Sequence, residues 1–139
     1  MKSNEKTIAV LSSHTPSLFW FRMEMMLCFQ QHGYCAFAIG NETEAVWKEQ
    51  FAEKGIIYKQ VYVNRNGVNP IDDLKTLSSI KKVLREIRPE KIFTYQAKTV
   101  IYGGIAANRL HITDVYPLIA GMGSVFLKHD ARTNIIRKI

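Results

Sequence analysis

The chain has 139 residues, enough for one domain with a proper hydrophobic core. Hydrophobic residues make up 47% and charged residues 22%, which excludes an intrinsically disordered chain. The formal net charge of +7 fits an acidic partner such as phosphate or anionic lipid, but charge alone is more simply explained by a basic surface without a specific partner.

The cysteine content and the length of the apolar runs indicate the cellular compartment of the protein. Cys28 and Cys35 are the two cysteines, too few for a disulfide framework, and residues 1–6 do not follow a signal-peptide pattern. The longest apolar stretch, residues 18–29, is interrupted by charged side chains and is too short to span a bilayer. We therefore expect a protein of the reducing cytoplasm.

Apolar runs that alternate with amphipathic segments predict strands that alternate with helices. The predicted strands comprise residues 7–12, 34–39, 56–63, 92–93 and 116–120. The predicted helices run from the loop 13–17 to about 32, from 41 to 55, from 69 to 88 and from 99 to 107. This alternation predicts an α/β fold, a three-layer Rossmann-like domain whose parallel sheet has the strand order 3-2-1-4-5.

Capping residues and prolines set the predicted boundaries. Asn41 begins a capping-box pattern, and Asn69 followed by proline is typical of a helix start. Pro117 lies inside the fifth strand, where its missing N–H is tolerated because the predicted order puts that strand at an edge. Asp130 predicts another helix without a stop signal, so we expect residues 1–139 to be one N-terminal domain of a longer protein.

Polar or glycine-rich loops follow the first, fourth and fifth strands. Because the carboxyl ends of parallel strands share one edge, where ligands bind in open α/β sheets, these loops predict a site. They comprise residues 13–17, 94–98 and 121–124. A helix N-terminus near Ser17 would attract phosphate or carboxylate. The simpler reading is that Ser17 is only an N-cap and His14 an exposed loop residue.

Common cofactor, metal and nucleic-acid motifs are not legible. The loop after the first strand has no glycine, and residues 121–126 lack the third glycine of a dinucleotide fingerprint. Cys28, His32 and Cys35 give three ligands where structural zinc normally has four, so we interpret both cysteines as core residues. The basic charge is not accompanied by a nucleic-acid recognition motif. We expect no metal and no nucleic acid.

The first predicted helix is apolar on nearly every side. Since a sheet covers one face of a helix, the other side chains of residues 18–29 must contact a neighbouring helix, another domain, a membrane surface or a hydrophobic ligand. Cations on the helix 69–88 either lie against anionic lipid or form a solvated face. These cations are Lys75, Lys81, Lys82, Arg85 and Arg88.

Several stretches, in this order, resemble the N-terminal domain of bacterial family 4 glycosyltransferases with the GT-B fold, the kind that assemble capsule, lipopolysaccharide and exopolysaccharide. They are residues 11–18 with Phe21 and Arg22, residues 64–65 with 69–70, residues 94–98 with 101–103, and residues 119–123. Together they cover nearly the whole chain.

The resemblance implies a retaining enzyme whose N-terminal domain binds a saccharide acceptor, often lipid-linked, at the inner membrane face. A C-terminal domain, which we expect to lie outside this sequence, would bind the nucleotide-sugar donor, so the fragment alone would be inactive. The resemblance implies no metal or other cofactor and does not assign catalytic residues. The implied substrate-binding residues are Ser13, His14, Ser17, Arg65, Tyr95, Gln96, Lys98, Gly121 and Gly123.

Two other functions remain open. A UDP-sugar 2-epimerase shares this half-fold but needs acid/base carboxylates at the carboxyl edge, where the sequence indicates none except Asp114, which precedes its strand. A non-catalytic subunit that pairs with a separate donor-binding chain, as in split glycosyltransferases, is the third function.

Overall fold

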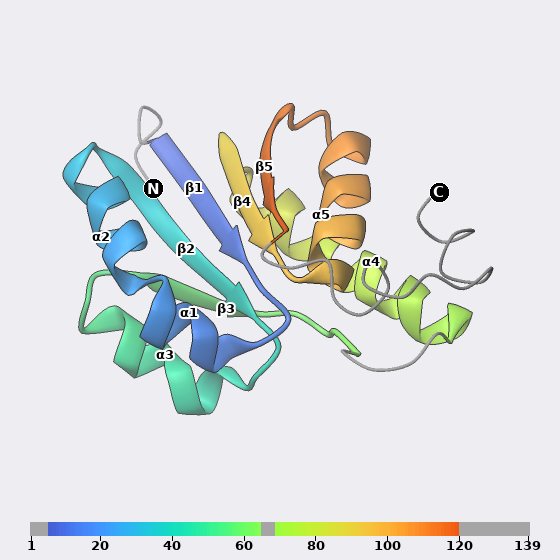
Figure 1. The fold of residues 1–139 in the computed structure, drawn as a ribbon, viewed down its shortest axis with the longest axis horizontal. Helices are drawn as coiled ribbons and strands as arrows, with labels where there is room; N and C mark the ends of the chain where they lie inside the picture. Colours follow the sequence, from blue (N-terminus) through green and yellow to red (C-terminus); the bar gives the residue numbers. More distant parts are fainter. Residues whose placement is uncertain (1–5, 65–68, 120–139) are drawn as a thin grey trace, which may run out of the picture.

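A computed structural model describes residues 6–64 and 69–119. Five parallel strands form one sheet in the order β3-β2-β1-β4-β5 (Figure 1), which confirms the predicted α/β Rossmann-like fold. The strands are β1 (Lys6–Leu11), β2 (Tyr34–Gly40), β3 (Ile57–Gln60), β4 (Lys91–Tyr95) and β5 (Asp114–Leu118). The helices are α1 (Thr15–Phe21), α2 (Met23–Gln31), α3 (Glu44–Ala52), α4 (Pro70–Ile87) and α5 (Ala97–Arg109).

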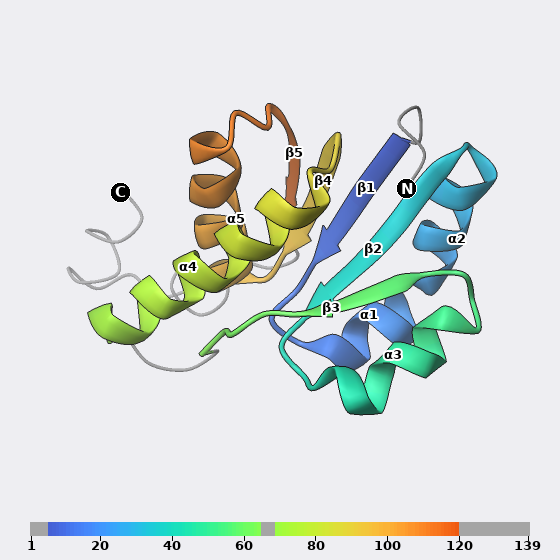
Figure 2. The ribbon, with the colours of Figure 1, turned by 180° about the vertical axis from the view of Figure 1, so that it is seen from behind.

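The helices cover both faces of the sheet, with α1 to α3 on one face and α4 and α5 on the other (Figures 1 and 2). Alternation along β1 shows the two sides. Ile8 and Val10 pack with α1 to α3, whereas Ala9 and Leu11 pack with α4 and α5. A central strand buried on both faces must be apolar at successive positions, and β1 is.

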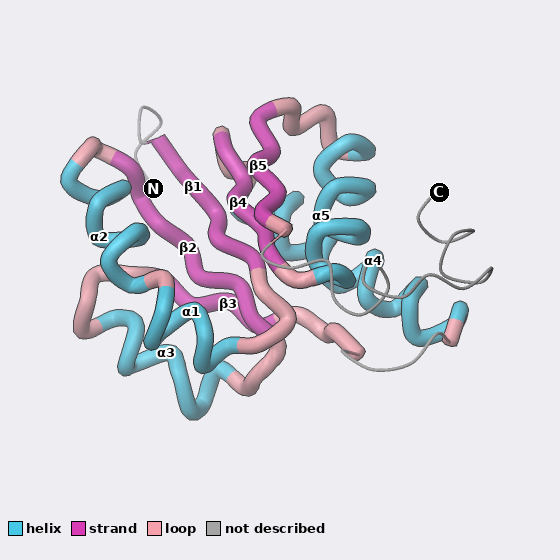
Figure 3. The backbone as a smooth tube through the Cα atoms, in the orientation of Figure 1, coloured by secondary structure: helices cyan, strands magenta, loops and turns pink. Residues whose placement is uncertain are grey.

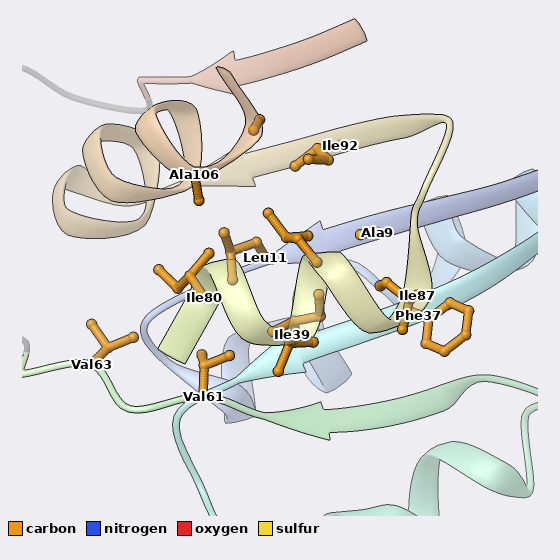
Figure 4. Close-up of a cluster of buried hydrophobic side chains, with 13 residues drawn as sticks. Ala9, Leu11, Phe37, Ile39, Val61, Val63, Ile80, Ile87, Ile92 and Ala106 are labelled. Carbon is orange, nitrogen blue, oxygen red and sulfur yellow. The ribbon is translucent and has the colours of Figure 1, made fainter. Parts of the chain in front are cut away.

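The core on the α4–α5 side positions the carboxyl end of β1. Figure 4 shows Ile80 of α4 beside Leu11 and Ile39 of the sheet, and all three side chains are fully buried. Each such aliphatic side chain contributes roughly 1.5–3 kcal/mol when buried. On α5, a Cβ at Gly103 would lie 2.7 Å from Leu11 Cδ2, so glycine is what lets this helix approach β1 closely.

The first predicted helix is in fact two helices joined at Arg22. α1 ends at Phe21 and α2 begins at Met23, with Arg22 at φ −119° and ψ 3°. Each helix buries part of its apolar surface: Leu18 of α1 and Met26 of α2 are fully buried, whereas Trp20 and Phe21 at the end of α1 are 70% and 79% exposed. The sequence did not indicate the joint because neither glycine nor proline marks it.

Other boundaries differ locally. Thr43, rather than the predicted Asn41, caps α3 by accepting a hydrogen bond from the Ala45 N–H. β3 has four residues instead of the predicted eight, and α5 begins two residues earlier than predicted, at Ala97.

Two predicted details are confirmed. The Asn69 side chain accepts a hydrogen bond from the Ile71 N–H and caps α4. Pro117 lies in the edge strand β5 opposite Thr94. The helix predicted from Asp130 lies outside the described residues. In the part of the chain that the structure describes, no helix combines the length and the apolar character required to cross a membrane.

Candidate functional site

The site lies between the neighbouring parallel strands β1 and β4, where the connections that follow the strands leave toward opposite faces of the sheet. β1 and β4 pair side by side, but α1 follows β1 onto one face of the sheet and α5 follows β4 onto the other (Figure 3). Such a switch point opens a crevice at the carboxyl ends of the strands, the usual ligand position in open α/β sheets. The loops that meet here are residues 12–14 and Gln96.

Gln96 joins the two loops. Its Oε1 accepts hydrogen bonds from the Ser12 hydroxyl at 2.7 Å, the Ser13 hydroxyl at 2.8 Å and the Ser13 N–H at 3.0 Å. Because a backbone N–H only donates, the amide oxygen must face β1 and Nε2 must face away. Within the described residues Nε2 makes no hydrogen bond, so two N–H donors are available to a ligand.

The backbone of Gln96 is strained. Its φ of 74° and ψ of 142° lie in a region that favours glycine, and a residue with a side chain there costs about 1–3 kcal/mol. The three hydrogen bonds to Oε1 offset this cost. The Gln96 carbonyl is also held, since it accepts from the Val100 N–H at 2.9 Å. The arrangement therefore fixes the amide at the crevice with little freedom.

A second contact links Ser17 of α1 to Tyr95 of β4. The Ser17 hydroxyl donates to the His14 carbonyl oxygen at 2.7 Å, and a hydroxyl has one proton, so Tyr95 must donate to Ser17 Oγ at 2.8 Å. Ser17 is therefore not the N-cap of α1; that position is His14, whose side chain makes no capping bond. Tyr95 is 5% exposed, so this contact between α1 and β4 is buried.

A third group of bonds joins the loops after β1 and β2. Asn41 Oδ1 accepts from the Thr15 N–H at 3.2 Å, and the Thr15 hydroxyl lies 2.9 Å from the Tyr58 hydroxyl. Tyr58 donates to the Glu42 carbonyl oxygen. Burial raises the pKa of Tyr58 to about 12, because the apolar surroundings disfavour the phenolate. These bonds fix the N-terminal end of α1 in place.

The pKa of Tyr58 predicts a loss of stability at high pH. An unfolded tyrosine ionises near pH 10, whereas folded Tyr58 keeps its proton to about pH 12. The stabilising contribution is thus complete below about pH 10 and is lost as pH rises toward 12, by roughly 1–3 kcal/mol. Urea unfolding at pH 9 and at pH 11.5 measures this loss. Between the two pH values the free energy of unfolding should fall more for the wild type than for Tyr58→Phe. Parallel losses would contradict this assignment.

Lys98 pairs with a carboxylate. Its Nζ lies 2.8 Å from Asp73 Oδ1, and both side chains are 16% exposed. The hydrogen bond from Lys98 holds the pKa of Asp73 below its usual range, so Asp73 is an ionised partner and not an acid. The pair ties α4 to the first turn of α5, immediately after β4. The edge therefore carries one carboxylate that the sequence analysis did not name, but Asp73 is paired with Lys98, and Asp114 lies at the amino end of β5.

Other sequence candidates are placed as follows. The His14 N–H donates to Ser12 Oγ at 3.0 Å, and the His14 carbonyl oxygen accepts from the Ser17 hydroxyl at 2.7 Å. Arg65, Gly121 and Gly123 lie outside the described residues, and their roles stay predictions.

The cysteines need a correction. Cys28 is exposed rather than in the core, with Sγ 3.8 Å from His32 Nδ1, and Cys35 packs against the core partly buried. Within residues 6–64 and 69–119, no group of three or more His, Cys, Asp or Glu side chains is arranged to hold a metal ion.

The structure adds two site residues that the sequence analysis named only as parts of the resembling stretches. Ser12 is fully buried yet bonds Gln96, and Arg22 lies over the Tyr95 ring at 4.7 Å. Gln96 also lines a cavity of about 390 Å³ between α5 and the end of β5. Its lining is mostly aliphatic, from Tyr95, Ala97, Val100, Ile101, Leu118 and Ile119. A polar rim thus borders an apolar cavity at the carboxyl edge of β4 and β5.

No protein-family model matches the chain. A curated relative is the N,N'-diacetylbacillosaminyl-diphospho-undecaprenol alpha-1,3-N-acetylgalactosaminyltransferase of Campylobacter jejuni, 26% identical over 131 residues, which are 94% of this chain and 34% of the relative. Among solved structures, MurG of Acinetobacter baumannii superposes with a TM-score of 0.60 at 19% identity, covering 88% of this chain and 37% of MurG.

The UDP-GlcNAc 2-epimerase of Methanocaldococcus jannaschii has the same fold, with a TM-score of 0.56 at 18% identity over 95% of this chain and 36% of the epimerase. Likeness at such identities shows the fold and does not separate transferase from epimerase. The chain spans about a third of the length of each of these three proteins. The comparisons confirm the resemblance drawn from the motifs: the chain is similar in sequence to a bacterial glycosyltransferase and in fold to the N-terminal domain of GT-B enzymes.

Proposed function

We propose that this chain is the acceptor-binding half of a retaining glycosyltransferase. The enzyme transfers a hexose or N-acetylhexosamine from a nucleotide sugar to a lipid-linked saccharide in bacterial surface polysaccharide synthesis. The observation that carries the proposal is the Gln96 junction, which fixes at the topological switch point two amide donors that residues 6–64 and 69–119 leave unused. The name of the Campylobacter relative, whose acceptor is a diphospho-undecaprenol saccharide, supports the acceptor class.

The chemistry of the edge favours recognition over catalysis. Amide N–H groups and hydroxyls are the usual partners of sugar hydroxyls, and Gln96 offers such donors on a rigid support. The nearby carboxylate Asp73 is neutralised by Lys98. The second domain would bind the nucleotide-sugar donor. Helix dipoles and basic residues of that domain would stabilise the leaving diphosphate.

A titration with a short acceptor analogue tests the proposal. The probe is N-acetylglucosamine linked through diphosphate to nerol, added to the uniformly ¹⁵N-labelled chain. We expect the largest chemical-shift changes at the amides of Ser12, Ser13 and Gln96, and no sugar transfer when UDP-N-acetylgalactosamine is added. Saturable binding that leaves these amides unmoved, or measurable transfer by the chain alone, would contradict the proposal.

A second part of the proposal is peripheral contact with an anionic membrane at its cytoplasmic face. Trp20 and Phe21 project from the end of α1, while the cations of α4 lie on the opposite side of the sheet. A flat membrane cannot contact both surfaces fully. We propose that the aromatic pair inserts at the interface, as amphipathic aromatic residues do.

Vesicle co-sedimentation measures this contact. Wild-type chain is expected to sediment with phosphatidylglycerol vesicles and less with phosphatidylcholine vesicles. The double variant Trp20→Ser, Phe21→Ser should lower the bound fraction several-fold. The reason is that each CH₂-sized group removed from the membrane interface lowers the binding free energy by about 0.8 kcal/mol. Lys81→Gln with Lys82→Gln serves as the control on the other face. Retention of the wild type in the supernatant with both vesicles would refute the membrane contact.

A further inference from the structure

We propose that Arg22 binds a phosphate group of the substrate at this edge. The proposal rests on the proposed function for the identity of the ligand, and on the geometry of Arg22 for the site. Arg22 occupies the joint between α1 and α2, and its guanidinium carbon lies 4.7 Å from the centroid of the Tyr95 ring. An arginine in this position is an attractive anion site because its planar group is held before the ligand arrives.

The support beneath Arg22 is rigid. Tyr95 is 5% exposed, and its hydroxyl donates to Ser17 Oγ at 2.8 Å. Ser17 in turn is fixed by its bond to the His14 carbonyl oxygen at 2.7 Å. The buried bond holds the Tyr95 hydroxyl and the long axis of the ring in place, and the guanidinium lies over this fixed ring.

Arg22 has no counter-ion among the described residues, whose ion pairs are Lys91 with Asp114 and Lys98 with Asp73. Its Nε is shielded from solvent and also has no hydrogen-bond partner in residues 6–64 and 69–119. A buried donor without a partner destabilises the fold, so this pose is not chosen for stability alone. Arg22 as a residue is only partly buried, and the terminal nitrogens of its guanidinium are the fork from which a pair of phosphate oxygens can accept hydrogen bonds.

Tyr95 connects Arg22 to the rest of the site. The same residue lines the apolar cavity of about 390 Å³ together with Gln96, Val100 and Leu118. A ligand whose phosphate binds Arg22 could thus also reach the Gln96 amide and the apolar cavity, because Tyr95 borders all three. The ligand chemistry is an organic phosphate or diphosphate. Its source is either the diphosphate of a lipid-linked acceptor or that of a nucleotide sugar.

Binding of inorganic diphosphate, followed by ¹⁵N chemical shifts at constant ionic strength, tests the role of Arg22. Arg22→Gln should weaken binding by about tenfold to a hundredfold, as expected when a charge-assisted bidentate contact is lost. Arg22→Lys, which keeps the charge but not the planar stack, should give an intermediate loss. Arg109→Gln is the matched control, because it removes the same charge at the exposed end of α5. Circular dichroism melting shows that each variant is folded.

Two further ligands identify the source of the phosphate. If geranyl diphosphate binds more tightly than inorganic diphosphate, Arg22 contacts the acceptor. If UDP binds more tightly than inorganic diphosphate, Arg22 contacts the donor. Either result supports the proposal when the tighter binding is lost in Arg22→Gln. Equal weakening in Arg22→Gln and Arg109→Gln, which indicates a diffuse positive field, overturns it. Failure of the wild type to bind any of the three anions overturns it too. Neither result changes the saccharide titration at Ser13 and Gln96, so the two proposals fail separately.

Discussion

Gly40→Ala is expected to lower the free energy of unfolding by about 2–4 kcal/mol. A Cβ at Gly40 would lie 2.2 Å from Thr15 Oγ1 and 3.1 Å from the Tyr58 hydroxyl oxygen. Both neighbours are buried and bonded to each other, so neither can move aside without losing a hydrogen bond. Urea unfolding monitored by circular dichroism measures the change.

Two comparisons make this result specific. Gly104→Ala, where a Cβ would meet nothing within 4 Å, should raise stability by up to about 1 kcal/mol, because alanine favours the helix. In a Thr15→Ala background the cost of Gly40→Ala should fall, since the closest atom is gone; a double-mutant cycle gives the coupling. Additive effects in that cycle would show that the contact with Thr15 is not the cause.

Gln96→Ala is expected to destabilise the chain by about 2–4 kcal/mol and to abolish binding of the saccharide probe. The truncation leaves the Ser13 N–H and the buried Ser12 hydroxyl without their acceptor, and alanine keeps the unfavourable φ of 74°. Gln96→Gly should be less destabilising than alanine by about 1 kcal/mol, because glycine relieves the backbone strain.

Gln96→Glu separates the structural role of this residue from its binding role. A carboxylate oxygen can accept from the same three donors, so stability should change by less than about 1 kcal/mol. The two N–H donors of Nε2 are lost, and probe binding should weaken at least about tenfold. If Gln96→Glu binds the probe as the wild type does, Gln96 supports the loop and does not contact the ligand.

The fold was predictable because its signals are local. The apolar run of β1, the Asn69 cap and the placement of Pro117 each depend on a few neighbouring residues, and all three are confirmed. The joint at Arg22 was not predictable, because the segment has helical residues throughout and only its contact with Tyr95, 73 positions on, accompanies the break.

For the candidate site, the sequence predicted several residues that come together but not the contacts among them. Parallel strands gave the edge and the residues Ser13, Ser17, Tyr95 and Gln96, which the structure brings together. Lys98 is equally near β4, but its partner Asp73 comes from a helix whose packing no local pattern specifies. Likewise, the sequence does not show that the amide oxygen of Gln96 faces β1, because that orientation depends on the Ser13 N–H, which lies 83 positions earlier in the chain.

The bond between the Ser13 N–H and Gln96 joins residues 83 positions apart, which has a consequence for how the protein is made. During synthesis on the ribosome, β1 emerges long before β4, so the loop after β1 has no acceptor until β4 is complete and docked. The Ser13 amide is thus a reporter of sheet completion. Its hydrogen exchange should be rapid in nascent chains that end before residue 91 and slow once β4 has docked.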